Sequence, residues 1–310
     1  MHYDPIKLRL ASLLKTPILR RLFHLALDLL FLRAWYVRRE LKRISDFGFR
    51  ISDLENNLHP TKIPHSAIRN PKFLDAGMGF GQYSDRLCRM FPGAKLVGLE
   101  IDHAHLYGCE DFFHRVHTEA RIIIGDVQRL PLEGNSFDLI LTVDVMEHID
   151  DDRAAFAEFY RVLKPGGALV MHTPRVRVKG ERIRDKGEEI RDEDTPPSSP
   201  PLAGGNKRSW EVGEHVRDGY RDSEARERLE RAGFTIERII RGYGRWGMVA
   251  WTLLQRVPLT MLGKSRWLAL VAALYLLPAL PIGLLAMWLD IRGGDHPDGG
   301  SLMVTALKTK

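Results

Sequence analysis

The sequence predicts an α/β fold with a doubly wound, mostly parallel sheet. Short apolar runs alternate with helix-like stretches between residues 72 and 174. Strands that alternate with helices indicate βαβ units, because parallel neighbours need a crossover connection. Glycines and acidic residues stand where several of these runs end, and ligands of such sheets bind beyond the carboxyl ends of the strands.

The first 43 residues carry the basic charge of the chain. They hold ten Lys/Arg and three Asp/Glu, whereas the other residues hold 36 and 37, so the net charge of +6 arises in this segment. A nucleic-acid enzyme would more often carry its charge around the active site, and no nucleic-acid partner is therefore expected. A basic segment ahead of a neutral body favours contact with an anionic membrane surface.

Within this segment, the sequence predicts an amphipathic helix that begins near Pro17, after Thr16. Asp28 and Arg33 interrupt its apolar run, so a complete membrane span is not expected, and no small-residue cleavage site indicates a secretory signal. We interpret residues 1–45 as an interfacial helix, with Lys and Arg facing lipid phosphates. The alternative is a helix that covers the surface of its own domain.

A glycine loop follows the first predicted strand, KFL. It reads Asp75-Ala76-Gly77-Met78-Gly79-Phe80-Gly81. Glycines at alternate positions let the backbone turn tightly and approach a ligand closely. The dinucleotide fingerprint would have Gly or Ala where Gln82 stands, which disfavours a nicotinamide cofactor.

Three further strands end in acidic residues. KLVGLE ends in Glu100, which can accept hydrogen bonds from both hydroxyls of a ribose. ARIIIGD ends in Asp126, which can accept from an adenine amino group, with the N–H of Val127 beside it. FDLILTVD ends in Asp144, and His148 lies just beyond it.

In this order, the motifs resemble the class I S-adenosylmethionine-dependent methyltransferases, and most of all the branch that includes the ubiquinone and menaquinone methyltransferases. The resemblance covers residues 71–242 and the C-terminal strand, and it implies a Rossmann-like sheet of seven strands, S-adenosyl-L-methionine as the cofactor and an enzyme that transfers a methyl group. The matching motifs are FLDAGMGFGQY, VGLEID, GDVQRLPLEGNSFDLILTVDVMEHIDD, LKPGGALVMHTP and EHVRDGYRDSEARERLERAGFTIER.

The resemblance also implies the residues that bind the cofactor. The glycine loop would wrap the methionine part with Asp75 near its ammonium group, Glu100 would hold the ribose, and Asp126 with Val127 would hold the adenine. The implied cofactor-binding residues are Asp75, Gly77, Gly79, Gly81, Tyr83, Glu100, Ile101, Asp126, Val127 and Asp144.

Candidate catalytic and substrate residues follow the fourth strand and the EHVRDGY motif. His148, with Asp144, is a candidate general base, since a phenol or activated ring carbon must lose a proton; alternatively it only hydrogen-bonds the local helix. His215, Arg217 and Tyr220 would lie near the substrate mouth, or they are ordinary surface residues. No metal is expected, because His103, His105 and Cys109 lack a partner cluster.

Two segments interrupt the α/β pattern. Residues 175–209 are charged or rich in Pro, Gly and Ser, which predicts a flexible excursion, either a lid or a tolerated insertion. Residues 267–289 carry no charge and are long enough to cross a bilayer. However, the alternating run SLMVTALKTK at residues 301–310 predicts the last, antiparallel strand of the same sheet.

A single span would place that last strand on the other side of the membrane. We therefore predict that the apolar run within the insertion (residues 245–300) forms a re-entrant helix–break–helix that turns at Pro278–Pro281, with arms of about 11 residues. Interfacial helices, or a buried cap in a soluble oligomer, are the alternatives. Trp267 and Trp288, near the two ends of the apolar run, are typical of an interfacial belt.

Four segments therefore make up the expected chain: an interfacial helix (1–45), a methyltransferase domain (46–244), an apolar insertion (245–300) and a final strand (301–310). The expected function is methyl transfer to an amphipathic or lipid-like acceptor, such as an isoprenoid quinone, on the cytoplasmic side of a membrane. A soluble metabolite or sugar as substrate, and a non-catalytic membrane scaffold, are the alternatives. The oligomeric state stays open.

Overall fold

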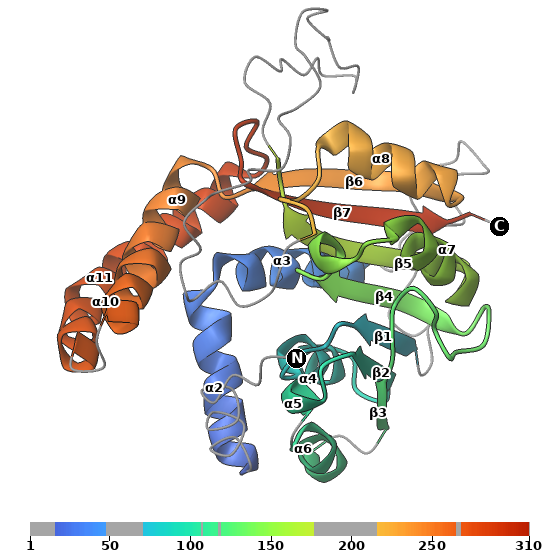
Figure 1. Cartoon of the computed structure of the whole chain (residues 1–310), viewed down its shortest axis with the longest axis horizontal. Coiled ribbons are helices and arrows are strands. Elements are labelled where there is room, and N and C mark those ends of the chain that lie inside the picture. The colour runs from blue at the N-terminus through green and yellow to red at the C-terminus, as the bar shows by residue number, and fades with distance from the viewer. Residues whose placement is uncertain are drawn as a thin grey trace, which may run out of the picture.

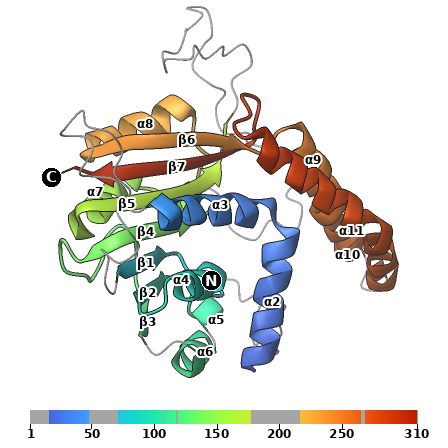
Figure 2. The same cartoon turned by 180° about the vertical axis from the view of Figure 1, so that it is seen from behind.

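The computed structural model describes residues 16–47, 71–106, 108–116, 119–176, 216–264 and 268–309. A seven-stranded sheet with the strand order β3-β2-β1-β4-β5-β7-β6 forms its centre (Figures 1 and 2). The first five strands pair in parallel, and β7 is antiparallel to both of its neighbours. This confirms the predicted fold class and the predicted last strand. The strands are β1 (Lys72–Ala76), β2 (Lys95–Glu100), β3 (Ala120–Ile124), β4 (Phe137–Val143), β5 (Leu163–Pro174), β6 (Phe234–Gly242) and β7 (Ser301–Lys308).

Helices cover both faces of the sheet, because strand side chains alternate between two buried clusters. Leu169 and Met171 of β5 pack with helices α7 and α8 on one face, whereas Ala168 and Val170 pack with α3 and α4 on the other. Short helices also follow β2 and β4. Together, the helices between β1 and β6 are α4 (Gln82–Met90), α5 (His103–Leu106), α6 (Cys109–Val116), η2 (Met146–His148), α7 (Asp152–Val162) and α8 (Asp222–Arg231).

The N-terminal segment is two helices rather than the one interfacial helix that we predicted. α2 (Pro17–Leu30) begins at the N-cap Thr16, whose hydroxyl accepts from the N–H of Leu19, and it ends at Phe31, which has extended backbone angles. α3 (Leu32–Phe47) lies against the sheet (Figure 2). Its apolar side chains are buried in the domain core, so here the alternative of a domain-covering helix is correct. The buried residues of α3 include Leu32, Ala34, Tyr36, Val37, Leu41 and Ile44.

Several basic side chains of this segment bind protein groups rather than facing outward. Arg20 is fully buried and donates to the carbonyl of Phe80. Arg39 donates to the carbonyl of Ile291, and Arg43 pairs with Glu237. The expectation that these arginines face lipid phosphates is therefore wrong, because groups far along the chain accept their hydrogen bonds.

The chain leaves β6 and returns to β7 through a helical hairpin that projects from the sheet (Figure 1). The outgoing arm contains α9 (Arg245–Trp251), the π-helical η3 (Thr252–Arg256) and α10 (Val257–Lys264). The returning arm is α11 (Leu268–Gly293), an uninterrupted helix of 26 residues that contains Pro278 and Pro281. The predicted helix–break–helix within residues 267–289 is therefore wrong, because α11 continues through both prolines. The insertion still forms a hairpin, but its chain reverses between α10 and α11.

Close packing of the two arms explains why the prolines do not break α11. Ala272, Ala279, Gly283 and Ala286 are buried, and a Cβ at Gly283 would lie 2.5 Å from Leu254 on the opposite arm. Small residues let helices approach this closely. Both prolines are exposed, so their rings do not enter the contact.

A buried carboxylate fixes the base of the hairpin. Asp290 is fully buried, and it accepts from the Tyr36 hydroxyl of α3 at 2.8 Å and from the N–H of Gly247 in α9 at 2.8 Å. Asp290 therefore joins both arms to the helix that covers the sheet. Asp290 itself therefore belongs to the core, whereas the neighbouring Trp288 is 44% exposed, and the interfacial belt stays a prediction.

Among the described residues, one helix is long and apolar enough to cross a membrane. It covers Leu270–Gly293, with a mean hydropathy of 2.2, and 28% of its most apolar window is buried. Core helices of soluble proteins share these properties, so length and composition alone are weak evidence. Trp267, His215 and most of the predicted flexible insertion, residues 177–209, lie outside the described residues.

Candidate active site

The glycine loop between β1 and α4 forms an open cradle at the carboxyl edge of the sheet. Gly77, Gly79 and Gly81 all have positive φ angles, of 80°, 53° and 81°. A Cβ at Gly77 would lie 2.2 Å from Val145, whereas a Cβ at Gly79 would meet nothing within 4 Å. The loop thus bends through glycine conformations and leaves space beside Gly79 for a ligand.

Glu100 holds this loop from the end of β2. One carboxylate oxygen accepts from the N–H of Gly79 at 2.8 Å, and the other accepts from the N–H groups of Ile101 and Asp102 at 3.0 Å. Burial opposes its ionisation, but the neighbouring His105 and these N–H donors outweigh burial and lower the pKa of Glu100.

These contacts leave about one of four lone-pair positions free on the Glu100 carboxylate. Glu100 therefore has room for one ribose hydroxyl in this arrangement rather than the two that we predicted. The adjacent side chain of Ile101 is 68% exposed, so it offers an apolar surface beside that position.

Asp75 is the last residue but one of β1, and it lies beside Gly98 of β2 in the sheet register. It is 1% exposed and accepts from the Ser84 hydroxyl at 2.6 Å. Burial, together with the charge of Glu100, raises the pKa of Asp75 to about 7. A ligand cation beside Asp75 would favour its charged form, as expected for a group near an ammonium.

Asp126 and Val127 follow β3, at the same edge. One oxygen of Asp126 accepts from the N–H of Gln128 at 2.9 Å and from its side-chain amide at 3.2 Å. The side chain of Val127 is buried. Asp75, Glu100 and Asp126 thus lie at the carboxyl ends of three neighbouring strands, β1, β2 and β3.

A second polar cluster lies where β4 and β5 end, beneath the start of α3. Asp144, with a φ of 53°, accepts from Arg33 at 2.5 Å and from the Nδ1 of His172 at 2.6 Å. Burial alone would raise the pKa of Asp144, but Arg33 and His172 outweigh it and hold this pKa far below its ordinary range. The hydroxyls of Tyr83 and Tyr243 lie close enough to Arg33 to interact with its charge.

Sequence reasoning missed Arg33, His172 and Tyr243. His172 could have been found, because it stands at the end of a predicted strand, as Asp144 does. Arg33 and Tyr243 carried no signal, since they are 111 and 99 residues away from Asp144 and reach it only through the fold.

His148 and Glu147 take different environments after β4. His148 lies on η2 with an exposed side chain, whereas Glu147 is 1% exposed and accepts from the Thr173 hydroxyl at 3.2 Å. Burial, with the charge of Asp144, raises the pKa of Glu147 to about 8. The pairing of His148 with Asp144 as the catalytic group stays a prediction, while the observed imidazole partner of Asp144 is His172.

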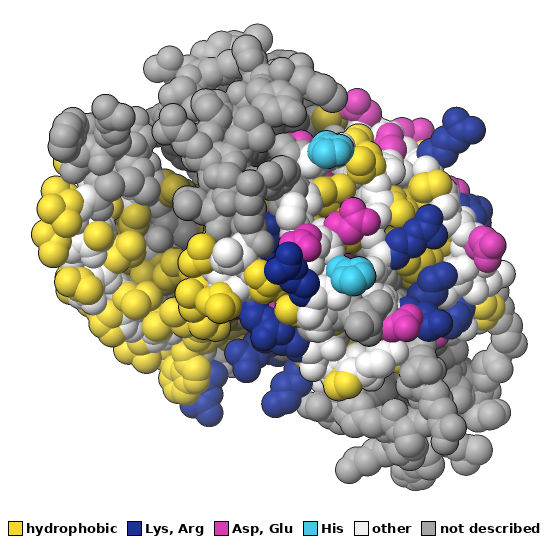
Figure 3. Space-filling view, turned by 90° about the horizontal axis from the view of Figure 1, so that it is seen from below, with side chains coloured by type: hydrophobic (Ala, Val, Ile, Leu, Met, Phe, Trp, Pro, Cys, Tyr) yellow, Lys and Arg dark blue, Asp and Glu magenta, His cyan; other side chains and the backbone are white. Residues whose placement is uncertain are grey.

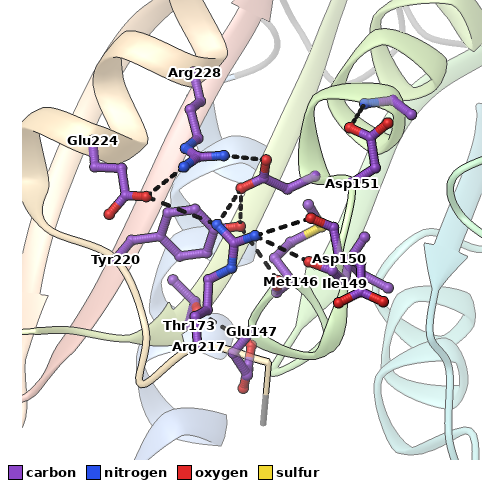
Figure 4. A network of polar contacts seen from close by, with 12 residues as sticks. Met146, Glu147, Ile149, Asp150, Asp151, Thr173, Arg217, Tyr220, Glu224 and Arg228 are labelled. Carbon is purple, nitrogen blue, oxygen red and sulfur yellow. Dashed lines mark hydrogen bonds and ion pairs between the residues drawn. The ribbon is translucent and has the colours of Figure 1, made fainter. Parts of the chain in front are cut away.

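Arg217 and Tyr220 belong to a buried network around Asp152 (Figure 4). Arg217 donates to Asp152 at 2.5 Å, and the fully buried Tyr220 donates its hydroxyl to the same carboxylate at 2.7 Å. Arg228 of α8 also contacts Asp152. The network ties the start of α7 to α8, so this geometry favours a structural role over the predicted contact with substrate.

Comparisons with known proteins agree with this geometry. A family model described as "Methyltransferase domain" matches residues 74–171. Malonyl-[acyl-carrier protein] O-methyltransferase of Hahella chejuensis is 34% identical over 102 residues, which cover 32% of this chain and 35% of that protein. Sterol 24-C-methyltransferase of Pneumocystis carinii is 31% identical over 106 residues, which cover 33% and 28%. The chain thus spans about a third of the length of these curated relatives.

One of the solved structures that are similar to this chain is also a methyltransferase. Phosphoethanolamine N-methyltransferase 2 of Haemonchus contortus, in complex with S-adenosyl-L-methionine, has a TM-score of 0.49 and 18% sequence identity, over 78% of this chain and 49% of that one.

The residues present fit S-adenosyl-L-methionine. The open space beside Gly79, the buried Asp75 and the carboxylate of Glu100 would receive the methionine, ammonium and ribose parts. Residues 74–171 therefore belong to the methyltransferase domain family, and this part of the chain is a class I S-adenosylmethionine-dependent methyltransferase domain with S-adenosyl-L-methionine as its cofactor.

Proposed function

We propose that the chain methylates an amphipathic, lipid-like acceptor at the cytoplasmic surface of a membrane. The observation that carries this proposal is a pair of exposed apolar surfaces, on α2 and on the hairpin, on either side of the start of α3 (Figure 1). The Arg33–Asp144 pair lies at that position, and its two side chains are 34% and 24% exposed.

The exposed surface of α2 is apolar apart from Arg21, whereas Arg20, His24 and Asp28 make its inner face polar. Arg20 and His24 both hydrogen-bond the carbonyl of Phe80, and Asp28 accepts from Gln82. A soluble helix normally has the opposite arrangement. The outward residues are Ile18, Leu19, Leu22, Leu25 and Leu29, with exposed fractions from 39% to 74%.

The hairpin adds a second and larger apolar surface. Hydrophobic side chains cover its face in Figure 3, on the left of the view. Exposed apolar area of this extent marks a membrane or protein contact. The exposed residues of α11 include Leu270, Val271, Leu274, Leu277, Ile282, Leu285 and Trp288.

The length of the hairpin allows it to enter the bilayer. The outgoing arm, residues 245–264, is about 30 Å long and α11 is about 39 Å long, at roughly 1.5 Å per residue. Both ends of the hairpin join the same sheet, since β6 pairs with β7. A hairpin that enters and returns on one side is therefore compatible with the fold, whereas one complete span is not.

The two surfaces meet near the second polar cluster. The carbonyl of Leu30, at the end of α2, accepts from Gln255 of the hairpin, and the next helix brings Arg33 to Asp144. An acceptor whose tail lies between α2 and the hairpin would present its head group to this pair. The sterol methyltransferase among the relatives acts, by its name, on a lipid, which supports this substrate class.

In this mechanism the protein acts mainly by positioning. When bound, the cofactor supplies a methyl group on a sulfonium, and in-line transfer depends on the alignment of the acceptor with that methyl. The glycine loop, Glu100 and Asp75 would hold the cofactor, and the cluster around Asp144 would hold the acceptor.

A labelled membrane extract tests the substrate class. The protein is incubated with the extract and S-adenosylmethionine labelled on the methyl group, and the products are partitioned between organic and aqueous phases. Label in the organic phase is expected. Label confined to the aqueous phase would refute a lipid acceptor and favour a soluble substrate, and no transfer despite cofactor binding would favour a scaffold.

Vesicle sedimentation tests the membrane contact separately. Leu25→Glu and Leu277→Glu should each weaken binding to phosphatidylglycerol-containing vesicles by at least about tenfold, because each removes about 1.5–3 kcal/mol of apolar burial. Ile124→Glu, at a similarly exposed residue outside both surfaces, is the matched control. Equal binding by all the variants would contradict the membrane contact.

A further inference from the structure

His172 carries a buried ring nitrogen that the structure leaves without a partner. The side chain is 3% exposed, its Nδ1 lies 2.6 Å from Asp144, and its Nε2 has no hydrogen-bond partner among the described residues. Burying an imidazole nitrogen without a partner costs about 1–3 kcal/mol, so a site that keeps one often has a use for it.

The contact with Asp144 determines which nitrogen holds the proton in the neutral ring. The pKa of Asp144 is held low, so this carboxylate is ionised at neutral pH and only accepts hydrogen bonds. Nδ1 must therefore donate its hydrogen to Asp144, and Nε2 carries the lone pair. The hydrogen bond from Nδ1 to Asp144 thus leaves Nε2 as the nitrogen that can accept a proton.

His172 lies at the edge of the sheet where the acceptor is expected. In the sheet register it is beside Val143, the residue before Asp144, and the N–H of Asp144 donates to the carbonyl of His172 at 2.9 Å. Along β5, His172 alternates onto the same face as Val170, which packs against α3. The imidazole therefore faces the helix that brings Arg33 to the site.

Charged and titratable groups reach this cluster from each surrounding element. They are Arg33 of α3, Tyr83 of α4, Asp144 after β4, Glu147 of η2 and Tyr243 after β6. Arg33, Asp144 and Tyr243 are the partly exposed members, so they mark the side from which an acceptor reaches the buried imidazole.

We propose that His172, oriented by Asp144, is the general base that takes the proton from a hydroxyl of the acceptor. This inference rests on the proposed methyl transfer, and it makes the acceptor a hydroxyl compound. As the oxygen–methyl bond forms and the methyl–sulfur bond breaks, the hydroxyl proton moves to Nε2. The ring then carries a positive charge that Asp144 stabilises, and it releases the proton to water after the product leaves.

His172→Asn separates the base from the hydrogen bond. The amide nitrogen of Asn can still donate to Asp144 in place of Nδ1, but no group replaces Nε2. With the membrane extract as acceptor source, label transfer should fall by at least about 100-fold, the lower range for removal of a general base. Affinity for S-adenosylhomocysteine and the unfolding midpoint should stay near the wild-type values. His114→Asn, at an exposed histidine of α6, is the control and should transfer label normally.

Two further measurements separate this role from a structural one. The pH profile of label transfer should lose its acidic limb in His172→Asn, which a packing defect alone would not cause. Nitrogen-15 NMR of histidine-labelled protein with S-adenosylhomocysteine should show the His172 Nε2 unprotonated at neutral pH, and Asp144→Asn should change that tautomer. If His172→Asn does not fold, His172→Gln is tested in the same way.

Transfer within threefold of wild type by a folded His172 variant would overturn the proposal, as would an Nε2 that carries the hydrogen. If the wild-type protein itself transfers no label, the proposed function fails instead, and the NMR measurement still decides the state of His172.

Discussion

Substitution of Gly79 by alanine tests whether the open space in the glycine loop is the cofactor site. The added Cβ meets no protein atom within 4 Å, so no steric clash is expected, and only the φ of 53° penalises alanine. A left-handed conformation costs a residue with a Cβ about 1–2 kcal/mol. If the cofactor occupies the space beside Gly79, the methyl group also displaces it, and we expect at least about a tenfold loss of affinity, or roughly 1.4 kcal/mol.

Gly294 provides a matched control, because it also has a positive φ, of 81°, and open space around its position. It follows α11, next to the β6–β7 end of the sheet, whereas the glycine loop follows β1, three strands away from β7 in the strand order. Urea unfolding should show a similar loss of stability for Gly79→Ala and Gly294→Ala. Calorimetry with S-adenosylhomocysteine should show weaker binding only for Gly79→Ala. Unchanged affinity in that variant would refute our placement of the cofactor.

Two further predictions concern buried carboxylates. Asp290→Ala should destabilise the protein by about 2–6 kcal/mol in urea unfolding with mild detergent, because the Tyr36 hydroxyl and the N–H of Gly247 each lose their acceptor. Asp295→Ala, at a 46% exposed side chain, should cost no more than about 1 kcal/mol, and an equal loss in both variants would contradict the role of Asp290. For Glu147, the pKa of about 8 in the folded state lies above the unfolded value of about 4.3, so the native state binds more protons between these pH values. The free energy of unfolding therefore falls as the pH rises through this range, by up to about 1.4 kcal/mol per pH unit. Glu147→Gln should remove this part of the slope in unfolding measured from pH 5 to pH 8.5, and an unchanged slope would show that Glu147 is not the group responsible.

Much of the fold follows from local patterns. The alternation of apolar runs with helical stretches predicted the parallel strands, and the alternating run at the C-terminus predicted β7. The requirement that β6 and β7 share one sheet predicted a hairpin between them, because chain connectivity forbids a single span. The glycine loop could be predicted because backbone positions with positive φ angles favour glycine, and the glycines can be read directly from the sequence.

The candidate site was predicted only in part. Asp75, Glu100 and Asp126 lie at one sheet edge because parallel strands end together, and this follows from strand order. The second polar cluster followed only for Asp144, because its other members come from separate elements that only the fold brings together. The hydrogen-bonding state of each carboxylate also depends on N–H groups that only the folded chain brings near it.

The sequence by itself determined the α/β sheet, the glycine loop and the presence of an apolar insertion before the last strand, since each depends on periodicity or on residues close together in the chain. Only the tertiary structure decided that α3 belongs to the core, that the hairpin reverses after Lys264 rather than at Pro278, and that Asp144 pairs with His172 and Arg33. The physical reason is that these outcomes depend on contacts between distant segments, such as Tyr36 with Asp290 across 254 residues. Burial and the pairing of charges outweigh local propensity at those positions.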